Sequence, residues 1–108
     1  MDQLQTIEQP GCVAAAVAIL GNKWSPMIIK ALASGPQRFC QLEQLLQGIS
    51  PRTLSQRLDD LEQYKIISKQ VFAEVPPRVE YTLTTKGLDV LPILKAMAEW
   101  GNKYPTDC

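Results

Sequence analysis

The fold is decided by the stretch GISPRTLSQRL, from Gly48 to Leu58, which predicts a tight turn that opens directly into a helix. Gly48 suits a backbone position with positive φ that ends a preceding helix. Ser50 is a good N-cap, and Pro51 fits the first helical position, where no amide hydrogen is needed. A helix is therefore expected to begin at this point of the chain.

That helix is expected to have two different faces. Leu54, Leu58 and Leu61 recur at helical spacing and form a narrow apolar stripe. The opposite face is polar: arginine can bind guanine with two hydrogen bonds, glutamine can do the same with adenine, and hydroxyl groups at a helix N-terminus suit phosphate oxygens. The residues that we expect to contact DNA from this helix are Ser50, Arg52, Thr53, Ser55, Gln56 and Arg57. Taken alone, the same residues are equally typical of an ordinary solvated helix surface.

Three helices are predicted before this one. The first runs from about Cys12 to Leu20. The second begins with Ser25 as its N-cap and Pro26 in the first helical position. The third is short, begins near Phe39 and is closed by Gly48. Two short helices around a glycine-containing turn predict a helix-turn-helix.

After Tyr64 the apolar residues alternate as they do in strands. The segments 67–71 and 79–83 predict a hairpin, with residues 73–77 as the connection. Pro76 and Pro77 stiffen the tip, because proline cannot donate a backbone hydrogen bond. The last three of these helices, followed by a hairpin, have the order of a winged helix-turn-helix domain.

The hairpin tip places Arg78 beside an exposed corner. A basic residue on a rigid projecting loop can enter a minor groove or contact phosphate. The alternative is an ordinary hairpin in which Arg78 pairs with Glu74 or Glu80.

The last helix is predicted from about Thr85 to Trp100, with Thr84 as its N-cap and Pro92 as a kink in its interior. Its apolar residues cover more than one face, which a small domain cannot bury by itself. We therefore expect a partner chain, and a two-fold dimer would present two half-sites to DNA. The alternative is a helix that folds back onto its own core.

Composition limits the class of protein. The chain has 108 residues, of which 45% are hydrophobic, and this fits one soluble domain over residues 1–108. A formal net charge of +0 means that any binding to nucleic acid must depend on local charge. No apolar run is long enough to span a bilayer, and the N-terminus lacks the basic start of a signal peptide, so we expect a cytoplasmic protein without a membrane partner.

Catalysis and metal binding are not expected. The sequence has three cysteines, no CxxC pair and no histidine, which argues against a disulfide scaffold and a conventional zinc site. It also lacks a nucleotide-binding glycine loop, and its carboxylates are not paired outside charged helix faces. We therefore predict that the protein is not an enzyme and needs no cofactor.

Six parts of the chain, taken together in their order and spacing, indicate a family. They are Cys12, GNKWSPMII (21–29), Arg38-Phe39, GISPRTLSQRLDDLE (48–62), EVPPRVEYTLTTKG (74–87) and VLPIL (90–94). They resemble the HxlR family of winged helix-turn-helix transcriptional regulators, and the resemblance spans nearly the whole chain.

The resemblance implies a homodimer that binds a pseudo-palindromic operator in double-stranded DNA. The helix of Arg52 would lie in the major groove, with the wing of residues 76–78 near the adjacent minor groove. It adds Arg38, Pro77 and Arg78 to the expected DNA contacts. It also implies dimer contacts by the first and last helices, the latter over residues 85–104. The expected interface residues are Val13, Val17, Val90, Leu94, Met97 and Trp100.

The chain also departs from the family pattern. Pro26 replaces a small polar or aliphatic residue, Tyr64-Lys65 stands where a glycine often ends the recognition helix, and Thr85 replaces a proline. Asp59 is expected on the outward face, where it would repel phosphate. We infer that only the first two turns of the recognition helix enter the groove.

The cysteines are candidates for a signal. Cys12 is expected near the N-terminus of the first helix, where the helix dipole favours a thiolate. The resemblance agrees, since several members of the family respond to oxidants or electrophiles through a cysteine at this position. The alternative is a small buried hydrophobic residue. Cys40 is expected to be buried, and Cys108 to lie in a flexible tail.

The sequence thus predicts a mainly α-helical chain with a small β-hairpin, forming a winged helix-turn-helix domain with N- and C-terminal dimerisation helices and a flexible segment 1–10. Its predicted function is homodimeric, sequence-specific regulation of transcription, with a response to oxidants or electrophiles through Cys12. Two alternatives stay open: a winged-helix module for protein interaction, and a DNA-binding regulator with a signal other than a thiol.

Overall fold

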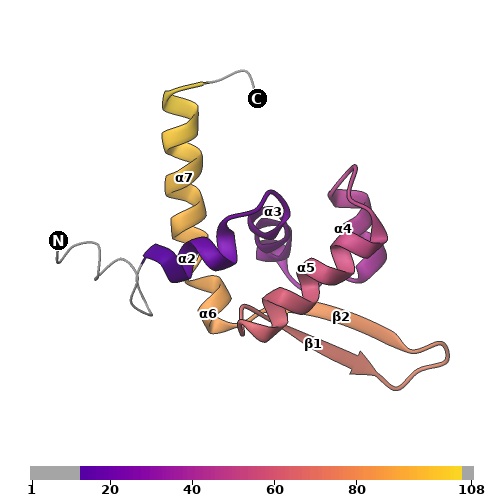
Figure 1. Cartoon of the computed structure of the whole chain (residues 1–108). Helices are drawn as coiled ribbons and strands as arrows, with labels where there is room; N and C mark the ends of the chain where they lie inside the picture. Colours follow the sequence, from indigo (N-terminus) through magenta and orange to yellow (C-terminus); the bar gives the residue numbers. More distant parts are fainter. Residues whose placement is uncertain (1–12, 106–108) are drawn as a thin grey trace.

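The computed structural model describes residues 13–105, which form a set of helices and a two-stranded hairpin that lies along one side of them, with its tip projecting (Figure 1). The elements are α2 (Val13–Leu20), α3 (Trp24–Ala31), the 3-10 turn η1 (Leu32–Ser34), α4 (Phe39–Leu45), α5 (Pro51–Gln63), β1 (Ile67–Phe72), β2 (Arg78–Leu83), α6 (Thr85–Leu88) and α7 (Leu91–Lys103). The predicted fold class is confirmed: α3, α4 and α5 followed by the hairpin form a winged helix-turn-helix. The predicted flexible segment 1–10 lies outside the described residues.

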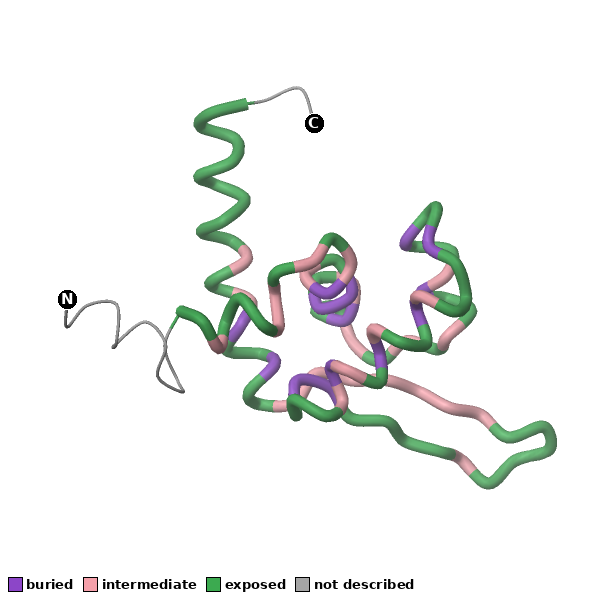
Figure 2. The backbone as a smooth tube through the Cα atoms, in the orientation of Figure 1, coloured by how far each residue is buried: buried purple, intermediate pink, exposed green. Residues whose placement is uncertain are grey.

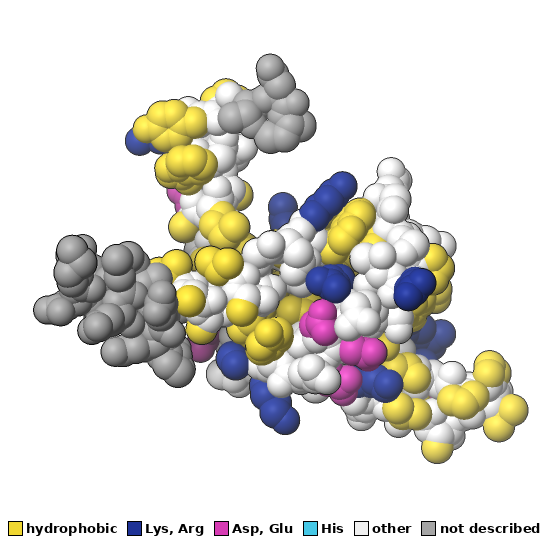
Figure 3. All heavy atoms as spheres, viewed as in Figure 1, with side chains coloured by type: hydrophobic (Ala, Val, Ile, Leu, Met, Phe, Trp, Pro, Cys, Tyr) yellow, Lys and Arg dark blue, Asp and Glu magenta, His cyan; other side chains and the backbone are white. Residues whose placement is uncertain are grey.

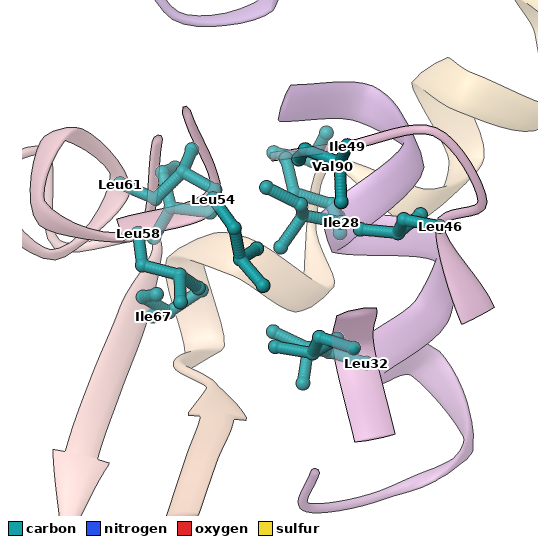
Figure 4. Packing of buried hydrophobic residues seen from close by; sticks show 12 residues of the cluster. Ile28, Leu32, Leu46, Ile49, Leu54, Leu58, Leu61, Ile67 and Val90 are labelled. Atoms are coloured by element: carbon teal, nitrogen blue, oxygen red, sulfur yellow. The ribbon is translucent and has the colours of Figure 1, made fainter. Parts of the chain in front are cut away.

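The core lies between α5 and the helices that precede it. The predicted leucine stripe of α5 is buried, and it meets Ile28 of α3 and Ile67 of β1 (Figures 2 and 4). Full burial of one such side chain stabilises the fold by roughly 1.5–3 kcal/mol. The apolar stripe therefore fixes the orientation of α5, and its polar face must point away from the core.

A short backbone bridge joins the hairpin to the helices, in addition to the packing of Ile67 in the core. Strands β1 and β2 are antiparallel, with Ile67 opposite Leu83 and Phe72 opposite Arg78. Gln37, just before α4, exchanges two backbone hydrogen bonds with Tyr81, with N–O distances of 3.0 and 2.8 Å. This bridge ties the entrance of the helix-turn-helix to the wing.

The predicted start of α5 is confirmed, but that of α3 is wrong. Gly48 has φ 92°, and the Ser50 hydroxyl accepts a hydrogen bond from the Thr53 amide at 3.1 Å. Helix α3 begins one residue before Ser25, and its cap is the side chain of Asn22, which accepts the Ser25 amide at 2.8 Å. Asparagine is as good a cap as serine, and it comes earlier in the chain.

The predicted C-terminal helix is also corrected, because it is two helices. Thr84 is the N-cap of α6, as predicted, and accepts a hydrogen bond from the Gly87 amide at 3.1 Å. The helix stops at Leu88, and α7 then starts at Leu91 with Pro92 in its first turn. Proline is well tolerated there, so it does not kink the interior of a helix. Helix α7 extends away from the rest of the chain (Figure 1).

Candidate nucleic-acid interface

The first two turns of α5 present an accessible polar surface. Ser50, Arg52, Ser55 and Gln56 are exposed, while Thr53 and Arg57 are half-buried. The Ser50 hydroxyl donates a hydrogen bond to the Thr53 side-chain oxygen at 2.9 Å, so the cap is ordered. Within residues 13–105, Arg52 forms no salt bridge. It is therefore an exposed cation at the beginning of a rigid helix.

Farther along α5, the acidic residue Asp60 binds two neighbouring polar side chains. Asp60 accepts a hydrogen bond from the Gln56 side-chain amide at 3.1 Å and lies 3.5 Å from Nη2 of Arg57. Asp59 affects Tyr81 instead. Burial raises the pKa of the Tyr81 hydroxyl, and the negative charges of Asp59 and Glu62 raise it further. Basic and acidic side chains consequently lie side by side over this region instead of forming one basic patch (Figure 3).

The C-terminal end of α5 is held by the segment TTKG, residues 84–87. The hydroxyl of Thr84 donates to the carbonyl oxygens of Lys65 and Ile66, and the ammonium group of Lys86 donates to the carbonyl oxygen of Tyr64 at 2.7 Å. Gly87 is buried, and a Cβ there would collide with the carbonyl oxygen of Ile66. These contacts give partners to the carbonyl groups of the C-cap residue Tyr64 and of the turn that follows α5.

Sequence reasoning missed this arrangement. Lys65, in the position where a glycine is usual, has φ 64°, which is the left-handed region. Its amide donates to the carbonyl oxygen of Glu62, and the next amide donates to that of Leu61, both in the pattern of a helix-ending Schellman motif. The run of threonine, lysine and glycine after β2 is the signal for these contacts, but the sequence alone gives it a role only in starting the last helix and in the family resemblance.

The wing has an exposed tip and a restrained arginine. Val75, Pro76 and Pro77 are exposed. Arg78, however, pairs with two acidic residues: its Nη2 lies 3.2 Å from Glu74, and its Nε lies 3.5 Å from Glu80. Both ion pairs considered as the alternative at this hairpin are thus present, and Arg78 does not extend freely into solvent.

Arg38, the remaining predicted DNA contact, is exposed at the N-cap of α4. Its backbone amide donates a hydrogen bond to the side-chain oxygen of Gln41 at 2.7 Å. The helix-turn-helix therefore presents its side chain at the start of α4.

The predicted dimer residues fall into three groups. Val13 and Val17 of α2 and Met97 and Trp100 of α7 are exposed, the tryptophan by 69%. Leu94 is half-buried against the core. Val90 is a correction: it is only 9% exposed and belongs to the core of its own chain, because the chain turns inward between α6 and α7.

An apolar groove runs between α2 and α7. It has a volume of about 290 Å³ and is lined by Ala16, Val17, Leu20, Gly21, Ile93 and Met97. No residue of α7 is buried, and Figure 2 shows most of this helix in the exposed colour. Among the described helices, α2 and α7 therefore carry apolar surface that their own chain leaves uncovered.

The structure bears on only one of the three cysteines. Cys12 and Cys108 lie outside the described residues. Cys40 is exposed, which corrects the expectation of a buried side chain. The apolar face of α4 passes through Leu42, and Cys40 lies two residues away, where a helix turns its side chains to another face. Within residues 13–105 no group of side chains suits a metal ion, and no helix could cross a membrane.

Comparison with known proteins identifies the family. The model of the HxlR-like helix-turn-helix family matches residues 19–107. A protein of Methanothermobacter thermautotrophicus described as an uncharacterized HTH-type transcriptional regulator is 42% identical over 92 residues, which cover 85% of this chain and 70% of that protein. The HTH-type transcriptional regulator YodB of Bacillus subtilis is 37% identical over 90 residues, which cover 83% of this chain and 80% of YodB.

Solved structures agree in fold. The redox regulator HypR in its oxidized form superposes with a TM-score of 0.81 at 32% identity, covering 87% of this chain and 97% of that one. The reduced form of YodB superposes with a TM-score of 0.78 at 35% identity, covering 88% and 93%. Because these relatives are transcriptional regulators, the prediction that the chain is not an enzyme is confirmed. The chain belongs to the HxlR-like helix-turn-helix family and is a transcriptional regulator.

Proposed function

We propose that this regulator is a homodimer that binds a pseudo-palindromic operator in double-stranded DNA and reads it with the first two turns of α5. The observation that carries this proposal is the surroundings of Arg52. Its side chain is exposed, has no acidic partner within residues 13–105, and stands on a helix fixed by a buried leucine stripe and an ordered cap. Such an arginine can form two hydrogen bonds with guanine.

The distribution of charged residues along α5 supports an arrangement in which only the start of the helix enters the groove. Arg52 and Ser55 lie in the first two turns, whereas Asp60 lies in the third and holds Gln56 and Arg57. Carboxylates repel phosphate, so the third turn would stay outside the groove. Gln56 would have to leave Asp60 in order to contact adenine, which makes Arg52 the stronger base-reading residue.

Secondary contacts would position the domain on the duplex. Ser50, Thr53, Ser55 and Arg57 would face phosphate oxygens near the α5 N-terminus, and Arg38 would do so from α4. The tip of the wing, with Pro77 and Arg78, would lie near the adjacent minor groove. These contacts fix register and orientation but carry little sequence information.

A two-fold dimer would bring two copies of α5 to successive major grooves, roughly 34–36 Å apart. The uncovered apolar residues of α2 and α7 favour this assembly, since Val13, Val17, Met97 and Trp100 are exposed in the single chain. Burial against a second copy would remove this surface from water.

The proposed signal is oxidation or alkylation of a thiol at Cys12. The names of HypR and of two YodB structures, in reduced and diamide-treated forms, refer to redox chemistry, and this supports a redox signal for the present chain. An added group or a disulfide at the start of the chain would act next to the proposed dimer helices, which set the distance between the two copies of α5. A buried Cys12 with another signal is the alternative.

A protein-interaction module is the second candidate function. It is favoured by the net charge of +0 and by the acidic partners of Arg57 and Arg78. A mobility shift with the DNA upstream of the chain's own gene separates the two. A DNA-binding protein forms a complex that weakens steeply as salt rises, because counterions are released from phosphates. An interaction module forms no such complex even at low salt.

A further inference from the structure

The wing carries a cluster of opposite charges at the point where it is proposed to meet DNA. Arg78 lies at the beginning of β2, and its guanidinium group is bordered by the carboxylates of Glu74 and Glu80, at 3.2 and 3.5 Å. On a third side, the guanidinium carbon lies 4.0 Å from the centre of the Phe72 ring. Within the described residues these four side chains form what we call the Arg78 clamp.

The clamp holds the arginine in place and reverses the local charge. The side chains of Arg78 and Glu80 are 29% and 26% exposed, so both are shielded from water by the hairpin. One guanidinium against two carboxylates leaves the cluster with a net negative charge. A single exposed ion pair is weak, but here two carboxylates and an aromatic face act on the same group.

A negatively charged wing should lower the affinity for non-operator DNA more than the affinity for the operator. Every duplex presents phosphates, and binding without base contacts depends almost entirely on cations near them. At an operator, base contacts by α5 fix the wing against the duplex, and Arg78 can then exchange its carboxylates for phosphate oxygens. On other sequences nothing fixes the wing, so the two carboxylates mainly repel the duplex.

From this geometry we propose that Glu74 and Glu80 are specificity-determining residues, which restrain Arg78 and suppress binding to DNA that lacks the operator sequence. The proposal rests on the proposed DNA-binding function and extends it to the wing. Specificity is a difference of affinities, and repulsion from wrong targets is one way of obtaining it.

The test is the double variant Glu74→Gln/Glu80→Gln, which keeps the size of both side chains and removes their charges. Affinities for a 25-base-pair operator duplex and a scrambled duplex of equal length are measured over a range of salt concentrations. We expect the scrambled duplex to bind about three- to tenfold tighter, with a salt slope steeper by about 0.9, the value for one added phosphate contact. Operator affinity should rise less, so that the ratio of the two affinities falls.

Two further variants separate the clamp from bulk charge. Asp89→Asn/Glu99→Gln removes two exposed carboxylates, one just after α6 and one in α7. Both helices lie far from the wing tip (Figure 1), so this variant should leave the ratio of affinities unchanged. Adding Arg78→Gln to the double variant should remove the increase in salt slope, because the released guanidinium group makes the added phosphate contact. Only the smaller gain that comes from removing the two repelling carboxylates should remain on scrambled DNA.

Four results would overturn the proposal. If wild-type protein binds both duplexes and the double variant matches it, the glutamates have no role in specificity. Equal gains on the two duplexes, or the same gain in the Asp89→Asn/Glu99→Gln control, would reduce the effect to bulk charge. If wild-type protein binds no duplex even at low salt, the proposed DNA-binding function fails, and the role of the clamp fails with it.

Discussion

Arg52 and Arg78 are both expected to contact DNA, but they differ in exposure and in their acidic partners. Arg52 is exposed near the start of α5 and has no acidic partner among the described residues. Arg78 is held by two glutamates and a phenylalanine ring. A free arginine is available for two hydrogen bonds to a guanine, whereas a restrained one must exchange partners first.

The first prediction compares these two residues. Arg52→Ala should weaken operator binding by about 1–3 kcal/mol and relax the base preference, because it removes a direct base contact. Arg78→Ala should weaken binding to both duplexes without changing which bases are preferred, because it leaves the carboxylates of Glu74 and Glu80 without their cation beside the DNA. Binding to operator and scrambled duplexes distinguishes the two, with Lys103→Ala as a control that removes one positive charge from the end of α7. Equal losses on both duplexes in Arg52→Ala would refute base reading by this residue.

A second prediction at this scale concerns the thiols. Cys12→Ser should keep the fold and operator binding but lose the response to mild oxidation, because serine has a similar size and cannot be oxidised in this way. Cys40→Ser and Cys108→Ser should respond nearly as the wild type does. Operator affinity is measured before and after oxidation, and thiol modification is followed by mass spectrometry. Unchanged wild-type affinity with a modified Cys12 would make the residue structural.

At the scale of single elements, α5 was predicted closely and its surroundings were not. Its beginning follows from local rules, since Gly48, Ser50 and Pro51 each suit one backbone position. Its end depends on Thr84 and Lys86, which come from beyond the hairpin and reach it only through the fold. Local rules cannot predict such a contact.

The third prediction uses the end of α5. Lys65 has φ 64°, and this conformation costs a residue with a Cβ roughly 1–2 kcal/mol. Lys65→Gly should therefore raise the free energy of unfolding by about 0.5–1 kcal/mol, part of the gain being offset by the greater entropy of glycine in the unfolded chain. Urea denaturation provides the measurement. Gln63→Gly, at the last residue of α5, should instead lower the free energy of unfolding by about 0.5 kcal/mol, since glycine is a poor helix former. A less stable Lys65→Gly protein would contradict this account of the helix end.

For the whole molecule, the uncovered surface of α7 is the main feature. Ile93, Met97 and Trp100 are exposed at helical spacing, while Leu94 faces the core from another side of the helix. The sequence revealed the excess of apolar residues. The sequence did not reveal which side of α7 faces the core and which side stays exposed, nor that Val90 is buried. Both depend on the break between α6 and α7.

The fourth prediction concerns assembly. Met97→Glu should weaken the proposed dimer and lower operator affinity with it, because a charge would be buried in an apolar interface. Met97 is exposed in the single chain, so the variant should still fold, whereas a charge at the half-buried Leu94 would also disturb the core. Asn102→Glu, on the opposite side of α7, is the matched control. Sedimentation at micromolar concentration measures the assembly, and a monomeric wild-type protein would count against the dimer.

The most direct test of the account is the ratio of two dissociation constants. Wild-type protein is titrated with an operator duplex, found by mapping the bound DNA upstream of its gene, and with a scrambled duplex of equal length and composition, at the same salt concentration. If α5 reads base sequence, the operator should bind about a thousandfold more tightly or better, as is typical of specific regulators. Equal dissociation constants for the two duplexes would contradict the claim that this helix reads DNA.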